Sequence, residues 1–424
     1  MNKRTTNSTT SGRHEVAVEP AVLGVHSEVG ALRQAIVHRP GLELTRLTPD
    51  NIESMLFDDV LWAARAGEEH DVFVGVLRDH GVQVHYFAQL LAEALDVPQG
   101  RQEVLDLVCT EERVGPSLVG QIREMADDVD GGTLATYLIG GITKADLHPK
   151  KPHSLLWASL SYNDFVLPPL PNHLFQRDNV SWVYGGVTIN PMAKAARQRE
   201  TINSRAIYRH HPLFADATFD VWLGREDRDL LPASLEGGDV HVIGNETVLI
   251  GMGERSSPMA IELLATELFN AHAAKRVVVV ELPKSHAFMH LDTVMTMIDN
   301  DTFIVYPYLN GEIRSWTLTR HDDHLKVKRN DDVWKASAEA LDIDKLRVLA
   351  VDEDERAAQR EQWDDGTNFL AVAPGVVMGW DRNVATNKML TKNGIEVLGV
   401  SGSELGRGRG GPRCMTCPIQ RDAI

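Results

Sequence analysis

The chain has 424 residues, of which 43% are hydrophobic, and it carries a formal net charge of −17 at pH 7. A chain this acidic is a poor candidate for general nucleic-acid binding, because such binding needs Lys and Arg to neutralise phosphates. The sequence contains no uninterrupted apolar run of about 18 residues, so we predict no membrane span. Its length leaves one large domain or two ordinary domains open.

The N-terminal segment is polar and rich in Ser and Thr. It lacks the apolar stretch of a secretory signal, so we expect residues 1–20 to form a disordered tail and order to begin near Ala21. The chain has three cysteines, which are too few for a disulfide framework. We therefore expect a cytoplasmic protein.

The first predicted elements are a strand at 32–37, a helix at 58–79 and a second strand at 82–86. Gly81 ends the helix, because glycine is favoured just beyond a helix C-terminus. From 88 to 147, Leu, Ala, Glu and Val recur at helical spacing, with breaks at steps that contain Pro or Gly. This pattern predicts a compact all-helical insert at 88–147.

From Leu174 onward, predicted strands alternate with helices. Gly185 and Gly186 lie between two apolar runs, which is a strong signal for a two-residue hairpin. The elements in chain order are strands at 182–184 and 187–189, a helix at 195–206, strands at 240–242 and 247–250, a helix at 257–272, strands at 277–280, 290–298 and 302–306, a helix at 331–341, strands at 348–351, 369–372 and 376–378, a helix at 382–392 and a strand at 397–400. The order strand, strand, helix, strand recurs without a residue-level repeat, so any internal symmetry is expected to be structural.

The glycine- and arginine-rich stretch 406–413 leads into Cys414 and Cys417. An RNA-binding segment of the RGG type is one interpretation, which the acidity of the chain opposes. Half a zinc site is another, but a structural site needs four ligands and the remaining cysteine, Cys109, lies in a distant helical stretch. A thioredoxin-like motif would open a helix, whereas here Pro418 follows. The functional interpretation is a flexible glycine loop that delivers a reactive thiol to a bound substrate.

Two short motifs carry other reactive side chains. His290 and Asp292 lie two residues apart on a predicted strand, so their side chains would face the same side and enter one site together. A surface pair is the more common explanation of that spacing. Glu236 and Asp239 flank two glycines; the motif fits a polar turn, and the glycines also permit the close backbone approach that would put Glu236 into a cleft.

A thiol, a histidine, several carboxylates and spare arginines together suit a guanidinium substrate. The segment 172–178 follows a proline-rich run and puts Asp178 at the head of the predicted hairpin. The carboxylates of Asp178 and Asp292 would bind guanidinium N–H groups in a bidentate manner and hold the carbon still. A thiolate would attack this carbon, and the histidine would deliver a proton to the departing ammonia.

The chain resembles the bacterial arginine deiminases, which are cysteine hydrolases of the pentein superfamily, from about Val25 to Ile419. The insert at 88–147 resembles the one that separates arginine deiminases from agmatine deiminases and amidinotransferases. The matching stretches are 25–30, 56–62, 175–178, 182–192, 236–239, 251–255, 289–293 and 414–419.

The resemblance implies an α/β fold: a five-bladed, pseudo-symmetric α/β propeller of ββαβ modules with the active site on its axis. Residues 21–87 and 148–424 would form this catalytic domain, and 88–147 an all-helical insert. The implied activity is that of an arginine deiminase, a hydrolase acting on C–N bonds of linear amidines. L-arginine would become L-citrulline and ammonia through an S-alkylthiouronium intermediate on Cys414, as the first step of arginine catabolism by the deiminase pathway. We expect no metal or cofactor, no nucleic-acid or membrane partner, and a homo-oligomer.

The resemblance also implies roles for individual residues. Cys414 corresponds to the nucleophile and His290 to the general acid and base. Asp178 and Asp292 correspond to the carboxylates that hold the guanidinium, and Glu236 to the carboxylate that supports His290 and the substrate. The implied substrate-binding residues are Asn172, Phe175, Arg197, Arg255 and Arg409, and Asp239 is expected behind them.

Arg197 and Arg255 correspond to the arginines that pair with the substrate carboxylate, and Arg409 lies on the mobile cysteine loop. The chain departs from the family just before the nucleophile, where many members carry Gly-His and this chain has Pro412 and Arg413. We expect Pro412 to stiffen the loop and Arg413 to add a charge that does not titrate. An amidinotransferase, and a redox or zinc module built on two cysteines, stay open as alternatives.

Overall fold

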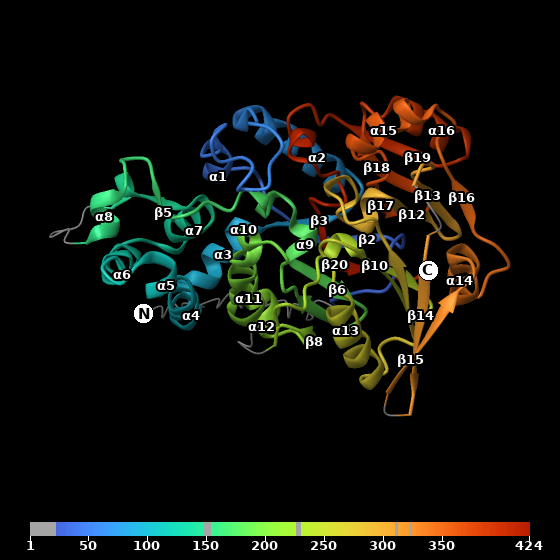
Figure 1. The fold of residues 1–424 in the computed structure, drawn as a ribbon, viewed down its shortest axis with the longest axis horizontal. Coiled ribbons are helices and arrows are strands. Elements are labelled where there is room, and N and C mark those ends of the chain that lie inside the picture. The colour runs from blue at the N-terminus through green and yellow to red at the C-terminus, as the bar shows by residue number, and fades with distance from the viewer. Residues whose placement is uncertain (1–22, 148–153, 226–229, 310–312, 323) are drawn as a thin grey trace, which may run out of the picture.

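The computed structural model describes residues 23–147, 154–225, 230–309, 313–322 and 324–424. The expected tail at 1–20 and the expected domain boundary at 148 lie outside these ranges. Within them, no helix is both long and apolar enough to cross a membrane. Figure 1 shows a group of helices at one end of the molecule and, beside it, a larger body of small sheets with their covering helices.

Four successive sheets of the larger body share one plan. Two antiparallel strands are followed by a helical segment and then by a third strand, which runs parallel to the second. Sheet by sheet, these strands are β6 (Val180–Val183), β7 (Gly186–Ile189) and β8 (Asp220–Leu223); β9 (Val240–Gly244), β10 (Thr247–Met252) and β11 (Arg276–Glu281); β12 (Met295–Asp299), β13 (Thr302–Val305) and β16 (Arg347–Leu349); and β17 (Leu370–Ala373), β18 (Val376–Trp380) and β19 (Glu396–Val400). The helices between the second and third strands are α10 (Ala195–Gln198), α11 (Glu200–His210), α12 (Pro212–Ala215), α13 (Pro258–Asn270), α14 (Val333–Leu341) and α16 (Val384–Lys392). The predicted recurrence of strand, strand, helix, strand is confirmed.

A further sheet joins the two ends of the described chain. Its strands, in spatial order, are β1 (Gly24–Val25), β20 (Cys417–Arg421), β2 (Leu32–Val37) and β3 (Gln83–Tyr86), and helix α2 (Ala63–Asp79) connects the last two. Strand β20 runs antiparallel to β2, and β3 runs parallel to it, so the plan of the other sheets recurs with the C-terminal strand in first place. Because β20 begins at Cys417, the sheet fixes the backbone three residues beyond Cys414.

Burial explains which strands the sequence predicted well. The run of valines in β11 predicted a buried strand, and β11 lies between β10 and β14 with its four valines buried. The hairpin of β14 (Ser315–His321) and β15 (His324–Asn330) was missed. Strand β15 is a largely exposed edge strand that carries Lys326 and Lys328, so its sequence shows little apolar alternation.

The helical region follows β3. It contains α3 (Phe87–Asp96), α4 (Pro98–Val108), α5 (Glu111–Val114), α6 (Val119–Asp127) and α7 (Gly131–Gly140), and a short strand pair of β4 (Ile142–Thr143) with β5 (Phe165–Leu167) follows. The Asp130 side chain caps α7 by accepting the Thr133 N–H. Arg46 and Arg199, from the larger body, donate to the carbonyls of Gly140 and Leu138 near the α7 C-terminus. These guanidinium groups compensate the negative end of the α7 dipole.

Two predicted elements begin five residues too early. The helix predicted from 58 begins at Ala63, and the strand predicted from 290 begins at Met295. Residues Leu291–Thr293 form a short 3-10 turn instead. The Leu291 N–H donates to the buried carboxylate of Asp239 at 2.8 Å. The backbone at this position is therefore hydrogen-bonded to a buried side chain and not to a neighbouring strand. The predicted helix at 195–206 is divided at Arg199 into α10 and α11.

Candidate active site

The predicted site residues lie together in the interior of the larger body. Eight of them line a narrow cavity of about 20 Å³, which has room for about one water molecule. These eight are Asn172, Phe175, Asp178, Arg197, Arg255, His290, Arg409 and Cys414. The other three, Glu236, Asp239 and Asp292, are buried directly behind and bond to residues of the wall or of its supporting turns. Leu56, His286, Met289, Thr293 and Gly408 also line the cavity and were not predicted.

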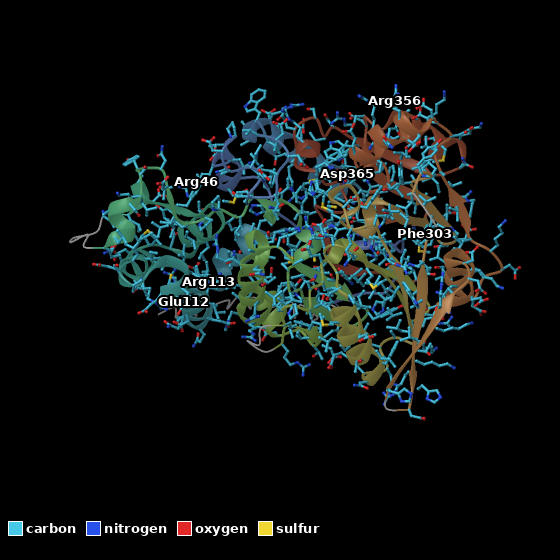
Figure 2. The ribbon with its side chains drawn as sticks, in the orientation of Figure 1. Arg46, Glu112, Arg113, Phe303, Arg356 and Asp365 are labelled. Carbon is cyan, nitrogen blue, oxygen red and sulfur yellow. The ribbon has the colours of Figure 1, made fainter. Side chains whose placement is uncertain are left out.

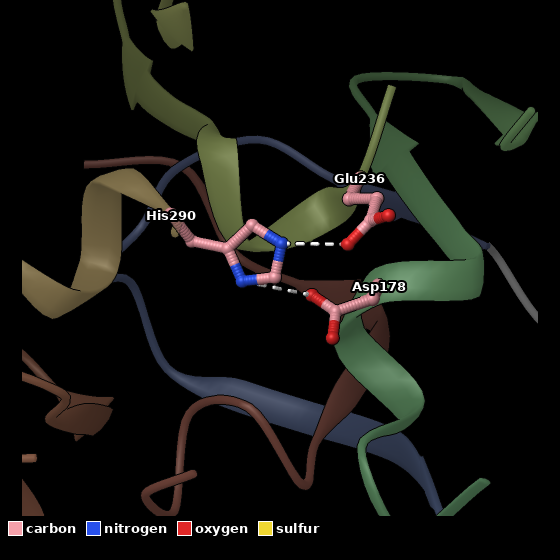
Figure 3. A group of neighbouring side chains, drawn as sticks. All are labelled: Asp178, Glu236 and His290. Carbon is pink, nitrogen blue, oxygen red and sulfur yellow. Dashed lines mark hydrogen bonds and ion pairs between the residues drawn. The ribbon is translucent and has the colours of Figure 1, made fainter. Parts of the chain in front are cut away.

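His290 lies between two carboxylates, as Figure 3 shows. Its Nε2 is 2.8 Å from Glu236 Oε2, and its Nδ1 is 3.7 Å from Asp178 Oδ1. Gly238 makes this arrangement possible, since a Cβ there would lie 2.7 Å from the imidazole ring. The Gly238 N–H also donates to Asp178 Oδ1 at 3.0 Å. The glycines of the Glu236–Asp239 motif therefore provide the close approach that the sequence suggested.

The charges around His290 favour its protonated form. Burial lowers the pKa of His290, but the Asp178 carboxylate, the hydrogen bond to Glu236 and the charge of Asp239 outweigh it and raise the pKa to about 9. Burial raises the pKa of Glu236, and Arg255 and His290 more than offset this and lower it to about 2. His290 is thus placed to hold a proton at neutral pH and to give it to a leaving group.

The two arginines expected to bind the substrate carboxylate differ in their present partners. Arg197 donates from Nη1 to Asp178 Oδ2 at 2.7 Å and from Nε and Nη2 to both oxygens of Glu200, at 2.9 and 3.0 Å. Arg255 donates from Nη1 to Glu236 Oε2 at 3.1 Å, while its Nε has no hydrogen-bond partner in the described part of the chain. Glu200 was not predicted, and its position at the start of α11 carries no sequence signal beyond a favoured first-turn acid.

Cys414 is buried, with 5% of its surface exposed. Its sulfur is 3.0 Å from Asn368 Nδ2 and 3.6 Å from Asp292 Oδ2. Burial raises the pKa of the Cys414 thiol well above its ordinary value, and the carboxylates of Asp292 and Asp178 raise it further. The free site therefore favours the thiol over the thiolate.

Arg413, one of the residues at which the chain departs from its family, has ion-pair partners that the sequence did not suggest. The Arg413 side chain is fully buried and donates from Nε to Glu28 and from Nη1 to Asp292 Oδ2, both at 2.7 Å. Arg413 and other buried cations lower the pKa of Glu28 to about 2 against the effect of burial, which is to raise it. Arg413 therefore orients Asp292 beside the Cys414 sulfur and does not extend into solvent.

Arg409 lies on the loop that leads to Cys414 (residues 406–414), which we call the cysteine loop. Its guanidinium carbon is 3.6 Å from the centre of the Trp363 ring. Its three side-chain nitrogens are buried, and no hydrogen-bond partner for them exists among the described residues. Its backbone is left-handed, at φ 61°. A buried guanidinium without an acceptor is suited to an anionic group of a ligand.

Asp239 supports the turn that carries His290. It accepts the Ser256 hydroxyl at 2.6 Å and the Leu291 N–H at 2.8 Å, and burial raises its pKa to about 7. Its oxygens bind other protein groups, so Asp239 holds the backbone beside His290 and does not line the cavity.

Asp178, Glu236 and His290 offer ligand atoms within 4.8 Å of one another. Both carboxylates already accept from a buried arginine, Asp178 from Arg197 and Glu236 from Arg255. A resident divalent cation would have to displace or repel both arginines. The donor set therefore fits a cationic organic substrate better than a metal ion.

The family model described as Arginine deiminase matches residues 53–421 of the chain. Among solved structures, the fold is similar to that of SxtG, an amidinotransferase from Microseira wollei, with 13% identity, a TM-score of 0.54, and 95% of this chain and 98% of that chain covered. It is also similar to DDAH from Pseudomonas aeruginosa, solved as a cysteine-to-serine mutant with citrulline, with 14% identity, a TM-score of 0.52, and 92% and 100% covered.

A third similar structure is unliganded AgrE, with 14% identity, a TM-score of 0.51 and 92% of this chain covered; the chain spans 40% of the length of AgrE. At these identities the structures show a shared fold. The family match extends over most of the sequence. The chain therefore belongs to the arginine deiminase family, a family of hydrolases that act on the C–N bonds of amidines.

Proposed function

We propose that the chain hydrolyses L-arginine to L-citrulline and ammonia, with Cys414 as the nucleophile and His290 as the general acid and base. One observation carries the proposal. A buried thiol and a histidine that retains its proton line the same narrow cavity, and carboxylates for a cationic substrate surround them. These groups are the ones that nucleophilic attack on a guanidinium carbon requires.

The guanidinium of arginine binds between Asp178 and Asp292 in this proposal. Asp292 Oδ1 is buried without a hydrogen-bond partner in the described residues, so it has an acceptor position for a substrate N–H next to Cys414. Asp178 accepts at present from Arg197, and the substrate guanidinium joins or replaces that contact. The Arg409 nitrogens have no hydrogen-bond partner in the described residues, and Arg255 Nε has only an ion pair with Glu254 Oε1 at 3.6 Å. Both side chains are therefore available for the α-carboxylate at the other end of the substrate.

Substrate binding also activates the nucleophile. Burial and the negative charges of Asp292, Asp178 and Asp365 keep Cys414 protonated in the free site. A guanidinium cation placed among these carboxylates neutralises them and lowers the pKa of the thiol. The thiolate then forms only when the substrate that it attacks is present.

The reaction proceeds in two halves. The Cys414 thiolate forms a bond to the guanidinium carbon, one C–N bond breaks, and ammonia leaves with a proton from His290. An S-alkylthiouronium group remains on the sulfur. Water adds to its carbon and gives one proton to His290. The C–S bond then breaks, the hydroxyl proton of the adduct passes to solvent as the ureido carbonyl forms, and citrulline leaves while the thiolate is restored.

The arrangement of sheets supports a finer description of the fold. Five sheets in the described chain share the order of two antiparallel strands, a helix and a parallel strand, with β20 starting the first. We propose that they form a five-bladed propeller around the site, that the helices at 88–147 form its insert, and that the enzyme is a cytoplasmic homo-oligomer at the first step of arginine catabolism.

The second candidate is an amidinotransferase, which the similarity to SxtG brings forward. In that reaction an amine, and not water, attacks the intermediate. The test is incubation of purified protein with L-arginine and no acceptor amine. We expect citrulline and ammonia in equal amounts; citrulline that forms only after an amine is added would replace the deiminase proposal with the transferase.

A further inference from the structure

The turn at 364–368, between α15 (Glu355–Trp363) and β17, contacts the nucleophile directly. Asn368 is fully buried at its end. The Asn368 side chain donates from Nδ2 to Cys414 Sγ at 3.0 Å and accepts the Cys414 backbone N–H on Oδ1 at 3.2 Å. We infer that Asn368 is a further catalytic residue, whose amide stabilises the Cys414 thiolate and holds the sulfur in position. This inference rests on the proposed role of Cys414 as the nucleophile.

The orientation of the Asn368 amide is fixed by its partners. The backbone N–H of Cys414 is a donor, so it must face the amide oxygen. The NH₂ group then faces the sulfur, which is an acceptor once it is ionised. Both bonds go to one residue, so a shift of the cysteine loop would break them together. Asn368 therefore couples the position of the Cys414 backbone to the ionisation of its side chain.

The cysteine loop is shaped to receive this amide. A Cβ at Gly411 would lie 2.6 Å from Asn368 Oδ1 and 2.8 Å from its Cβ, so only glycine leaves room for the contact. The neighbouring Thr367 hydroxyl donates to the Asp292 carbonyl at 3.2 Å. The turn thus contacts both the nucleophile and the backbone of Asp292, whose carboxylate lies beside the sulfur.

The charges around the sulfur show why a neutral donor matters. Asp178, Asp292 and Asp365 all act against the thiolate, and Figure 2 labels Asp365 in the turn itself. Arg413 favours the thiolate, but its guanidinium is shared between Asp292 and Glu28. A hydrogen bond donated to the charged form favours ionisation without adding a charge that would repel the substrate cation. The Asn368 amide supplies this bond.

The test separates the donor from the acceptor of the amide. Asn368→Asp keeps the shape and the oxygen that accepts the Cys414 N–H, but it loses the donor and adds a carboxylate. Asn368→Ala removes both bonds. For each protein we would measure kcat, KM and the pH dependence of iodoacetamide modification at Cys414, with the modified cysteine located by tandem mass spectrometry. Asn387→Ala is the control, because its amide bonds the Trp380 carbonyl within the same region and lies outside the site.

Both Asn368 variants should raise the pH midpoint of alkylation, the Asp variant by more, and lower kcat on the order of 10- to 100-fold with little change in KM. The control should match the wild type. An Asn368→Asp protein with a normal midpoint would show that the amide only fixes the loop, and would overturn the inference. Alkylation needs no turnover of arginine. If the wild-type protein makes no citrulline, the proposed function is rejected. A midpoint that still shifts in the Asn368 variants would then leave the role of Asn368 in thiolate formation intact.

Discussion

The two halves of the site respond in opposite ways to the same negative charges. On the histidine side, Asp178 and Glu236 raise the pKa of His290 to about 9 against burial. On the cysteine side, burial together with Asp292 and Asp178 raises the pKa of Cys414 well above its ordinary value. A carboxylate that stabilises an imidazolium destabilises a thiolate, so the acid is prepared before the substrate binds and the nucleophile is not.

The two halves also differ in how their carboxylates are satisfied. Asp178 and Glu236 each accept from a buried arginine, Arg197 and Arg255. Asp292 uses one oxygen for Arg413, and the other has no hydrogen-bond partner among the residues that the structure describes. The cysteine side is therefore the half that the substrate cation completes.

Removing the sulfur should have the largest effect. Cys414→Ala should lower kcat by about 10⁴-fold or more, because the covalent step has no other nucleophile. Cys417→Ala and Cys109→Ala should keep most of the activity, since neither thiol lines the cavity. The measurement is citrulline formation, with mass spectrometry of quenched wild-type turnover to locate the adduct. Citrulline made by Cys414→Ala at a comparable rate would reject the nucleophile.

Arg413 should matter most for stability. Arg413→Met leaves the buried carboxylates of Glu28 and Asp292 without their cation and should lower the free energy of unfolding by about 3–5 kcal/mol at neutral pH. Because the folded pKa of Glu28 is lowered to about 2 from an ordinary 4.5, the stability from this pair is present above pH 4.5 and is lost as the pH falls towards 2. The penalty of Arg413→Met should therefore shrink over the same pH range.

Urea unfolding at several pH values measures this effect. The double variant Glu28→Gln/Arg413→Met is the control, since it removes one of the two uncompensated charges and should recover part of the loss. Equal stability of Arg413→Met and the wild type at pH 7 would contradict the buried pair. Arg413→His should be intermediate and should add an ionisation to the activity profile between about pH 5 and 8.

Substrate selection should have the next largest effect. Arg255 and Arg409 have buried nitrogens that lack hydrogen-bond partners in the described chain, and an α-carboxylate satisfies them. Agmatine lacks this carboxylate, so its kcat/KM should be lower by on the order of 100-fold, which corresponds to a few kcal/mol for buried donors left unpaired. Parallel measurements with arginine and agmatine decide the point. Similar values for the two substrates would assign these arginines another role.

The smallest effect concerns the histidine side. Glu236 favours the imidazolium, so Glu236→Gln should lower the pKa of His290 from about 9 by about one unit or more. Because His290 must be protonated to release ammonia, the basic limb of the kcat/KM profile should move to lower pH by the same amount. Glu200→Gln is the matched control: this buried carboxylate bonds Arg197 and not His290, so it should change KM and leave the limb in place. An unmoved limb in Glu236→Gln would remove Glu236 from the support of His290.

The predictable parts of the molecule are those with local signals. The valines of β11, the hairpin of β6 and β7, and the amphipathic run in α13 were located within a residue or two by their composition and spacing. The hairpin loop is Tyr184 and Gly185, one residue before the predicted glycine pair. Cys414, Glu236 and Asp239 were suggested by motifs that combine a reactive side chain with glycines, and His290, Asp292 and Asp178 by motifs without glycine. Their roles came from the family resemblance, and they stay proposals.

The missed parts lack such signals. Asn368 is one asparagine at the end of a turn, and its importance depends on a residue 46 positions later. Glu28 belonged to a matching stretch, but nothing in that stretch indicated an ion pair with Arg413. The strand predicted at 290 failed because a buried carboxylate from another segment holds the Leu291 N–H.

The sequence by composition and spacing indicated the hydrophobic periodicity of most strands and helices, their order apart from the β14–β15 hairpin, and the set of reactive groups. These features depend on neighbours within a few residues. Three features became visible only in the fold: that β20 completes the first sheet, which charges surround the Cys414 thiol, and that Asp292 Oδ1 is left for a substrate. These properties arise from contacts between distant segments in a buried, weakly screened interior. There, a single paired or unpaired charge shifts the pKa of its neighbours, and the strength of that effect depends on distances that the order of residues does not contain.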